Sequence, residues 1–285
     1  MSSSEAVRGD GDGWVHCSDG QRRWGRFGAA GLLLRVPAPD GGALALLQHR
    51  AAWTHQGQRW GLPGGARNSE EDAAATALRE AREEAGVDTD RLHVVAEHVD
   101  HPAGDAWTYT TVVADAAQPL ALSANQESAE LRWVPEPQVA ELALHSGFAA
   151  SWASLRARHV TLLVDAANVV GSVPDGWWRD RAAAAQRLLR RCAATVPGTL
   201  PLPGGDFAWM RRGIVVLEGA GSAAADVPGL DVVRARGSGD DTLVEIAGHE
   251  PDCLLVSADR GLRARLPLTA ASVGPGVLLD RLPRA

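Results

Sequence analysis

Lysine does not occur in this sequence of 285 residues, so all 28 of its Lys or Arg positions are arginine. Any cationic side chain that contacts a phosphate must therefore be a guanidinium, which is planar and can donate two parallel hydrogen bonds. Acidic residues outnumber basic ones by 35 to 28, which gives a formal net charge of −7. A protein of this charge has no overall field that attracts nucleic acid, which argues against non-specific binding to DNA or RNA.

Cysteines and long apolar runs are also scarce. The three cysteines lie far apart, which excludes a disulfide framework and fits a reducing compartment. No stretch approaches the roughly 20 consecutive apolar residues of a membrane span. The polar N-terminus MSSSEAVRGDGDG lacks the apolar core of a signal peptide. We therefore expect a cytoplasmic protein with no membrane partner.

The length and the apolar pattern predict two α/β domains after a short tail. Residues 1–26 are irregular and are expected to be an N-terminal tail, either mobile or laid on the first domain as a strand. Residues 27–157 are expected to form the first domain. In residues 158–285, buried-strand runs alternate with helical patterns, which predicts a parallel sheet covered by helices on both faces.

Residues 65–87 combine a glycine turn with a predicted helix over 70–86, and they read GARNSEEDAAATALREAREEAGV. Glu80, Glu83 and Glu84 stand at positions i, i+3 and i+4, so one face of this helix presents three carboxylates. Like charges at this density destabilise a helix unless a cation neutralises them. Hard oxygen ligands suit Mg²⁺ or Mn²⁺, which can bridge phosphates and acidify a water molecule. The spacing therefore predicts a divalent-metal site.

The same segment resembles the Nudix box, which is a glycine, five residues, a glutamate, seven residues and then Arg-Glu-aliphatic-x-Glu-Glu-x-Gly-aliphatic. The matching positions are Gly65, Glu71, Arg79, Glu80, Ala81, Glu83, Glu84, Gly86 and Val87. Ala81 departs mildly, because a bulkier aliphatic residue is usual there. The resemblance implies an α/β/α sandwich with a mixed sheet. It also implies a hydrolase that cleaves a phosphoanhydride of a nucleoside diphosphate derivative.

The resemblance assigns expected roles to several residues. Arg79 would hold the carboxylates in place, and Glu71 would support the water molecule of the metal. A further acid or base is expected from the segment QESAELRWV (126–134), where Glu130 matches best and Glu127 is second. The residues expected around the metal are Glu80, Glu83, Glu84, Gly64 and Gly65.

Substrate contacts are predicted from two regions. Arg50, Arg59 and Arg67 flank the glycine turn and are candidates for phosphate contacts. The segment after Trp133 resembles nucleoside triphosphate pyrophosphohydrolases of the family, which would place His145 and Phe148 near a base pocket. An ADP-ribose or nucleotide-sugar pyrophosphatase is the alternative that the sequence leaves open.

Residues 160–285 carry a separate set of acids near the ends of predicted strands. The segment LLVDAAN puts Asp165 at the carboxyl end of a strand, where open α/β sheets bind ligands. The expected acidic site consists of Asp165, Asn168, Asp240, Asp241, Glu245 and Asp259. These motifs resemble the PIN-like nuclease superfamily and its NYN branch, whose members use Mg²⁺ or Mn²⁺ to hydrolyse RNA.

Three functions follow from the two sites. The leading hypothesis is a Mg²⁺-dependent nucleoside triphosphate pyrophosphohydrolase. The second is a metal-dependent ribonuclease in which the Nudix half senses a nucleotide, with RNA as the partner of the C-terminal domain. The third is a Nudix half that binds a nucleotide without cleaving it and regulates the second domain. The sequence leaves a homodimer open and does not identify the base or the bond attacked.

Overall fold

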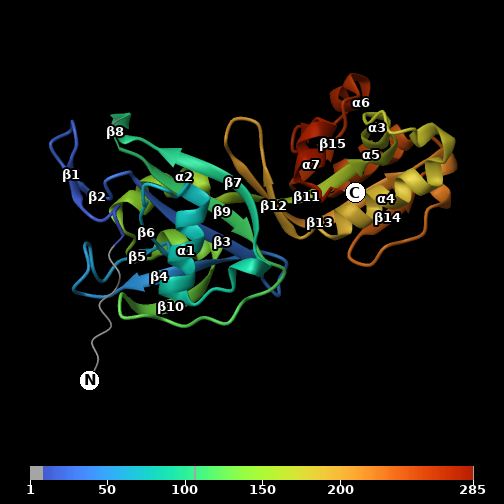
Figure 1. Cartoon of the computed structure of the whole chain (residues 1–285). Coiled ribbons are helices and arrows are strands. Elements are labelled where there is room, and N and C mark those ends of the chain that lie inside the picture. Colours follow the sequence, from blue (N-terminus) through green and yellow to red (C-terminus); the bar gives the residue numbers. More distant parts are fainter. Residues whose placement is uncertain (1–8, 106, 285) are drawn as a thin grey trace. The chain divides into compact units, whose positions relative to one another are not determined.

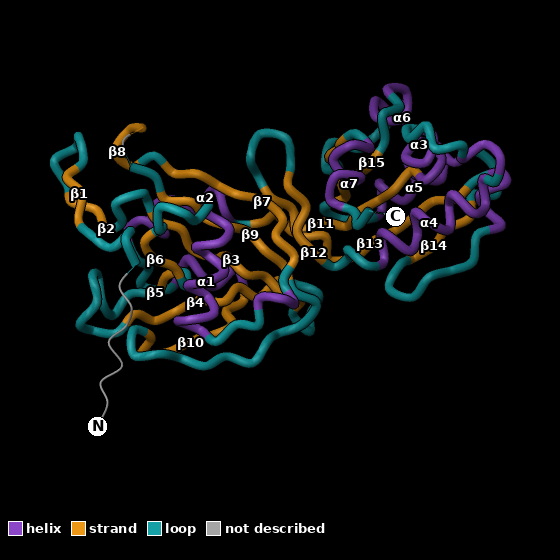
Figure 2. Tube along the Cα trace, viewed as in Figure 1, coloured by secondary structure: helices purple, strands orange, loops and turns teal. Residues whose placement is uncertain are grey.

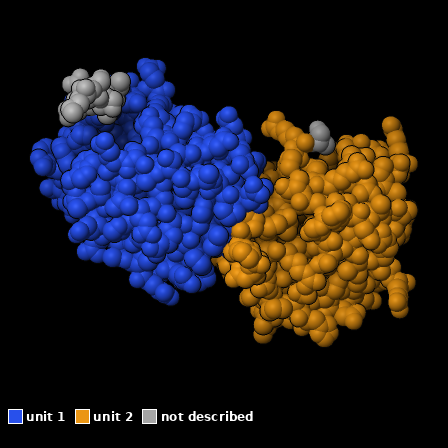
Figure 3. Space-filling model, turned by 90° about the horizontal axis from the view of Figure 1, so that it is seen from below, with its two compact units in different colours: residues 1–36, 43–155 blue, residues 37–42, 156–285 orange. Residues whose placement is uncertain are grey.

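The computed structural model describes residues 9–105 and 107–284. The chain divides into two compact units, each with its own sheet. Unit 1 comprises residues 1–36 and 43–155, and unit 2 comprises residues 37–42 and 156–285 (Figure 3). Within the described residues, no helix is long and apolar enough to span a membrane.

Unit 1 is built on a mixed seven-stranded sheet (Figures 1 and 2). The strands of the unit are β1 (Trp14–His16), β2 (Arg22–Trp24), β3 (Ala29–Pro37), β4 (Ala43–Arg50), β5 (Trp60–Gly61), β6 (Gly64–Ala66), β7 (His93–Asp100), β8 (Pro102–Asp105), β9 (Tyr109–Asp115) and β10 (Ser128–Pro135). The sheet order is β10-β4-β3-β9-β7, with β5 beside β4 and β6 beside β3. Strands β3 and β9 are parallel, whereas β10 and β4, and β7 and β9, are antiparallel. The predicted mixed sheet is therefore confirmed.

Helices cover both faces of this sheet. The helices of the unit are α1 (Ala73–Ala85) and α2 (Ser146–Leu155), with 3₁₀ turns at Thr89–Arg91 and Glu136–Glu141. The buried alanines of α1 pack against Leu34 and its neighbours on one face. Side chains alternate along a strand, so Arg35 points to the other face. There its guanidinium donates to the carbonyl of Leu155 in α2.

The ends of α1 are set by two residues. The Asp72 carboxylate caps the start by accepting the Ala75 N–H at 2.7 Å. Gly86 ends the helix in the left-handed region, with φ of 64°, and donates its N–H to the Arg82 carbonyl. A Cβ at Gly86 would lie 2.8 Å from the Cβ of Ser123, so this position favours glycine for space as well. The helix is shorter at its start than the predicted 70–86 because Asp72 is the cap.

Residues 9–26 form a defined part of unit 1, while residues 1–8 of the predicted tail lie outside the described residues. Strands β1 and β2 pair antiparallel, with Trp14 opposite Trp24. The Gly25 N–H donates to the Gly13 carbonyl at 2.9 Å. The Gly11 N–H donates to Oδ1 of Asn68 at 3.2 Å. Residues 9–26 thus contain a two-stranded hairpin that is hydrogen-bonded to unit 1 but does not join its seven-stranded sheet.

Unit 2 contains a six-stranded sheet with helices on both faces. Its strands are β11 (Ala157–Asp165), β12 (Gly198–Pro201), β13 (Phe207–Leu217), β14 (Asp231–Arg234), β15 (Cys253–Val256) and β16 (Ala271–Val273). The helices are α3 (Ala166–Gly171), α4 (Arg181–Ala193), α5 (Gly239–His249), α6 (Arg260–Ala264) and α7 (Pro275–Arg281), with 3₁₀ turns at Trp177–Arg179 and Gly219–Ala223. The sheet order is β12-β13-β11-β15-β16, with β14 beside β13. Every pair is parallel except β12 with β13.

Candidate active site

Three glutamates of α1 differ sharply in their exposure. Glu84 is buried, with 3% relative exposure. The side chain of Glu80 is 14% exposed, and that of Glu83 is 57% exposed. The helical spacing puts the three on one side of α1, as the sequence predicts, but at increasing distance from the sheet.

Glu84 is the carboxylate held most firmly by the backbone. Its Oε2 accepts the N–H of Gly64 at 2.8 Å, from the strand that precedes the helix. Burial raises the pKa of Glu84 to about 8, and the negative charge of Glu80 adds to the rise. The Gly64 amide and the Arg50 guanidinium act in the opposite direction. A carboxylate in such surroundings is stabilised in its charged form by an added cation.

The guanidinium of Arg79 donates hydrogen bonds to the other three acids of the Nudix box. Its Nε donates to Glu71 Oε1 at 2.7 Å, and its Nη2 donates to Glu71 Oε2 at 3.0 Å. Its Nη1 donates to Glu80 Oε1 at 2.7 Å and to Glu83 Oε2 at 3.3 Å. Hydrogen bonds from Arg79 lower the pKa of Glu71 to about 2, whereas burial raises that of Glu80 to about 6. Glu71 thus orients the guanidinium, and the guanidinium orients Glu80.

At both glycines of the turn, a Cβ atom would lie too close to a neighbouring atom. A Cβ on Gly65 would lie 2.4 Å from Oε1 of Glu80. A Cβ on Gly64 would lie 2.5 Å from the Ala30 carbonyl oxygen and from the Gly31 Cα. The lack of a side chain thus lets Gly65 lie directly against the Glu80 carboxylate and lets Gly64 lie directly against the backbone of β3.

The two candidate glutamates of the later strand separate in the structure. Glu130 makes an exposed ion pair with Arg132, with Oε1 2.6 Å from Nη2. Glu127 lies just before β10, and its charge contributes to the rise in the pKa of both Glu80 and Glu84, after the larger effect of burial. Both residues stay candidates for the late acid, and Glu127 is the one whose charge acts on Glu80 and Glu84.

The donor chemistry of this cluster fits a hard divalent cation. Burial raises the pKa of both Glu84 and the partly buried Glu80, and the charge of Glu80 adds to the rise at Glu84, a cost of ionisation that Mg²⁺ or Mn²⁺ would offset. In the described residues, no group of three or more His, Cys, Asp or Glu side chains is already arranged around one point. Glu83 is the member held by the longest contact to Arg79, and its exposed side chain is free to turn towards a cation.

Of the predicted substrate residues, Arg50 is one whose charge acts on Glu84, and His145 neighbours Arg50 and His55. Burial lowers the pKa of His145 to about 4, and the charges of Arg50 and His55 add to the effect. Arg50 Nε donates to the carbonyl of His55 at 3.2 Å. Tyr109, the only tyrosine in the chain, is a neighbour that the sequence does not reveal. Burial raises the pKa of its hydroxyl, and the nearby charge of Glu84 adds to the rise.

The other three substrate candidates are placed differently. Arg59 is exposed on the loop between β4 and β5, and Arg67 is half-buried after β6. The ring of Phe148 is 8% exposed and packs 5.4 Å from the ring of Trp152. Phe148 therefore contributes to packing, and its ring has little free surface for a base.

The second acidic set meets at the carboxyl edge of the unit 2 sheet. Asp165 ends β11, where its Oδ1 accepts the Asn168 N–H at 3.0 Å and its Oδ2 accepts the Ser257 hydroxyl at 2.8 Å. Burial raises the pKa of Asp165, with further contributions from Asp240 and Glu218. Glu218 directly follows β13 and was missed by the sequence reasoning, although it stands just after an apolar run.

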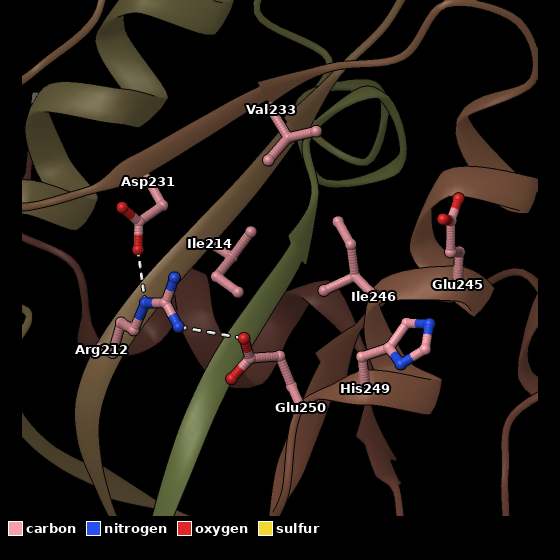
Figure 4. A pocket seen from close by; sticks show the side chains of 8 residues that line it. All are labelled: Arg212, Ile214, Asp231, Val233, Glu245, Ile246, His249 and Glu250. Carbon is pink, nitrogen blue, oxygen red and sulfur yellow. Dashed lines mark hydrogen bonds and ion pairs between the residues drawn. The ribbon is translucent and has the colours of Figure 1, made fainter.

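Two more of the predicted acids, Asp240 and Asp259, belong to this cluster, and the other two lie apart from it. Burial raises the pKa of Asp240, and the charge of Asp259 is the next contribution. Asp241 instead pairs with Arg265 at 2.5 Å. Glu245 lines a separate groove of about 250 Å³ between α5 and strands β13 and β14 (Figure 4).

Comparison with known proteins identifies unit 1. The family model of the NUDIX domain matches residues 27–154. A protein of Mycobacterium tuberculosis named "Putative 8-oxo-dGTP diphosphatase 3" is 58% identical over 163 residues, which cover 56% of this chain and 75% of that protein. The chain belongs to the Nudix family. The predicted Nudix domain is confirmed over residues 27–154.

Other relatives share the Nudix part. A Bifidobacterium longum protein named "Nucleoside triphosphate pyrophosphatase/Nudix hydrolase fusion protein" is 38% identical over 162 residues, which cover 54% of this chain and 33% of that protein. The crystal structure of the M. smegmatis Nudix hydrolase RenU matches with a TM-score of 0.49 and 56% identity, covering 50% of this chain and 91% of that one. The protein is a Nudix hydrolase, an enzyme of the pyrophosphohydrolase class, as the box predicts.

Proposed function

We propose that the Nudix unit hydrolyses a phosphoanhydride of a nucleoside triphosphate, with 8-oxo-dGTP as the first substrate to test. The observation that carries the proposal is the buried Glu84, which accepts the Gly64 amide, with the partly buried Glu80 beside it, an arrangement suited to a divalent cation and a polyphosphate. The choice of substrate is supported by the printed name of the Mycobacterium tuberculosis relative, which shares 58% of its residues over the matched segment.

The cation in this proposal is Mg²⁺ or Mn²⁺. Glu80, Glu83 and Glu84, next to the backbone of Gly64 and Gly65, are the residues that would hold it. When bound, such a cation neutralises phosphate charge and favours loss of a proton from water. Arg79 keeps Glu80 in position, and Glu71 keeps Arg79 in position, through the hydrogen bonds described above.

The remaining roles concern the water molecule and the substrate. Glu127 is proposed to accept the proton of the attacking water as the bond between phosphorus and the bridging oxygen breaks. Arg50 is proposed to contact the phosphates, since it lies among the buried acids and carries a fixed positive charge. His145 is proposed to lie beside the base. Arg59 and Arg67 stay candidates for phosphate contacts at the rim.

Rates for different substrate classes test the proposal. We expect the full chain with Mg²⁺ to show its highest kcat/KM on 8-oxo-dGTP or another nucleoside triphosphate, at least tenfold above ADP-ribose and nucleotide sugars. A substrate site that must hydrogen-bond one base rejects analogues strongly, because its buried polar groups would be left without partners. The measurement is the rate of phosphate and pyrophosphate release. A preference for ADP-ribose or a nucleotide sugar would replace the triphosphate assignment with the pyrophosphatase alternative.

A second candidate function concerns unit 2. We propose that residues 158–285 form a PIN-like domain of the NYN type that cleaves RNA with Mg²⁺ or Mn²⁺. The proposal is supported by the position of Asp165, Asp240, Asp259 and Glu218 at the carboxyl edge of a largely parallel sheet. In this arrangement the Nudix unit would bind a nucleotide as a sensor or act as an independent enzyme. Three buried free cysteines among the described residues support action in the cytoplasm.

Replacing Asp165 by asparagine separates the two activities. Asparagine can keep the cap on α3 but removes a charge from the edge cluster, so we expect cleavage of single-stranded RNA to fall by at least tenfold. Hydrolysis of nucleoside triphosphates should not change. Asp226→Asn, an exposed aspartate paired with Arg234, is the matched control. Equal RNA cleavage by wild type and Asp165→Asn would reject a nuclease role for this cluster.

A further inference from the structure

The N-terminal hairpin exposes two tryptophans that the proposed function does not use. Trp14 and Trp24 stand opposite each other in β1 and β2, and each is 41% exposed. Their ring centroids are 5.3 Å apart at an interplanar angle of 75°. The Arg22 guanidinium lies 5.1 Å from the centre of the Trp14 ring. The hairpin therefore presents a fixed aromatic surface with a positive charge beside it.

A continuous series of rings connects this surface to the Nudix site. The ring of Trp14 lies 5.4 Å from that of His55, at 73°. The ring of His55 lies 6.2 Å from that of His145. Arg50, which donates to the His55 carbonyl, is among the groups whose charge acts on Glu84. Trp14 is thus linked through His55 to His145, the residue proposed to lie beside the base.

Hydrogen bonds hold the hairpin at this end of the unit. The Arg26 N–H donates to the Gly11 carbonyl at 2.8 Å. The Ser69 N–H, from the loop that leads into α1, donates to Oδ1 of Asp10 at 3.0 Å. On the other side, Nη2 of Arg23 donates to the Pro102 carbonyl at 3.2 Å. The aromatic surface is consequently fixed relative to the box rather than carried by a loose segment.

We propose that this hairpin is the outer wall of the substrate site, where the nucleobase stacks on one of the two exposed tryptophan rings while the other packs edge-on against it. A nucleoside polyphosphate fits an aromatic surface that lies next to an arginine and a divalent-metal site. Its flat, uncharged base can stack on a tryptophan ring, while its phosphates bind the cation. The inference rests on the proposed nucleotide substrate and adds the residues that select for a base. Inorganic polyphosphate has no base, so its Kd should not depend on these tryptophans.

Direct binding and turnover test the hairpin separately from the proposed function. The variants are Trp14→Leu and Trp24→Leu, which keep an apolar side chain in the hairpin but remove the aromatic face. The probes are the non-hydrolysable α,β-methylene analogue of dGTP for Kd by calorimetry, and dGTP for kcat and KM. Inorganic tripolyphosphate is the probe without a base. Trp178→Leu is the matched control, because Trp178 is a 55% exposed tryptophan of unit 2.

Each variant is expected to raise the Kd of the analogue and the KM of dGTP about tenfold, since base–aromatic stacking contributes at about this level. The kcat for dGTP and the Kd of tripolyphosphate should stay within about twofold of wild type, which also shows that the variant is folded. Trp178→Leu should match wild type throughout.

The other outcomes each decide one claim. Unchanged Kd and KM in both variants would overturn the hairpin inference and leave the tryptophans as a surface for another macromolecule. Loss of tripolyphosphate binding together with the analogue would also overturn it, because the effect would then be structural. A wild-type chain that binds the analogue in a Trp14-dependent way but hydrolyses neither 8-oxo-dGTP nor any other nucleoside triphosphate would refute the proposed function alone. No binding of the analogue to wild type would reject both.

Discussion

Glu84→Gln is expected to lower kcat/KM for nucleoside triphosphate hydrolysis by about 10³-fold while the protein stays folded. The glutamine can still accept the Gly64 N–H, so the local packing is kept, but the buried negative charge that would hold the cation is lost. Burial of the Glu84 charge costs desolvation free energy, and the substitution removes that cost. In the absence of metal, the unfolding free energy of the variant should therefore equal or exceed that of wild type. The measurements are steady-state kinetics and thermal unfolding.

Metal-dependent stabilisation provides the second readout for this variant. A ligand that binds only the folded state raises its stability, by about 2.7 kcal/mol at a concentration of 100 Kd. Mg²⁺ or Mn²⁺ should therefore raise the Tm of wild type and have a much smaller effect on Glu84→Gln. Glu70→Gln is the matched control, because Glu70 is an exposed glutamate just before α1. Full turnover by Glu84→Gln would contradict the assignment of the α1 carboxylates as the metal site.

Glu127→Gln is expected to lower kcat by about 10²-fold with little change in KM, because a positioned general base typically contributes 10²- to 10⁴-fold. The expectation depends on placement, since the charge of Glu127 acts on both Glu80 and Glu84. The measurement is kcat and KM for the preferred nucleotide at saturating Mg²⁺.

Glu130→Gln supplies the comparison for Glu127. Its carboxylate makes an exposed pair with Arg132, so the variant should keep kcat within about twofold of wild type. A large loss in Glu130→Gln with normal turnover in Glu127→Gln would assign the base to Glu130, as the sequence motif alone suggested.

The helix and its charges could be predicted because they depend on local spacing. The positions of Glu80, Glu83 and Glu84 on one face follow from the helical repeat, and the end of the helix at Gly86 follows from its tolerance of a positive φ. The mixed sheet of unit 1 followed from the family resemblance and is confirmed. The helix start differed because Asp72, and not an earlier residue, accepts the first free N–H.

Features that depend on distant parts of the chain could not be predicted. Tyr109 reaches the site because β9 pairs in parallel with β3, a pairing that no local pattern encodes. The charge of Glu127 acts on Glu80 and Glu84 whereas Glu130 pairs with Arg132, and no local pattern encodes the register shift of β10 between Ser128 and Glu130. The hairpin of residues 14–24 is too short and irregular to show a strand period, and its tryptophans are related to the site only through His55.

The carboxylates of α1 are proposed to support metal-dependent hydrolysis of a nucleoside triphosphate. The most direct measurement is phosphate and pyrophosphate release from 8-oxo-dGTP by the full chain with Mg²⁺, after removal of the metal with EDTA, and after its return. We predict release with Mg²⁺, loss of release with EDTA and recovery when Mg²⁺ is restored. Release that continues without divalent metal, or no release from the folded and metal-bound protein with any nucleoside triphosphate, would contradict the account.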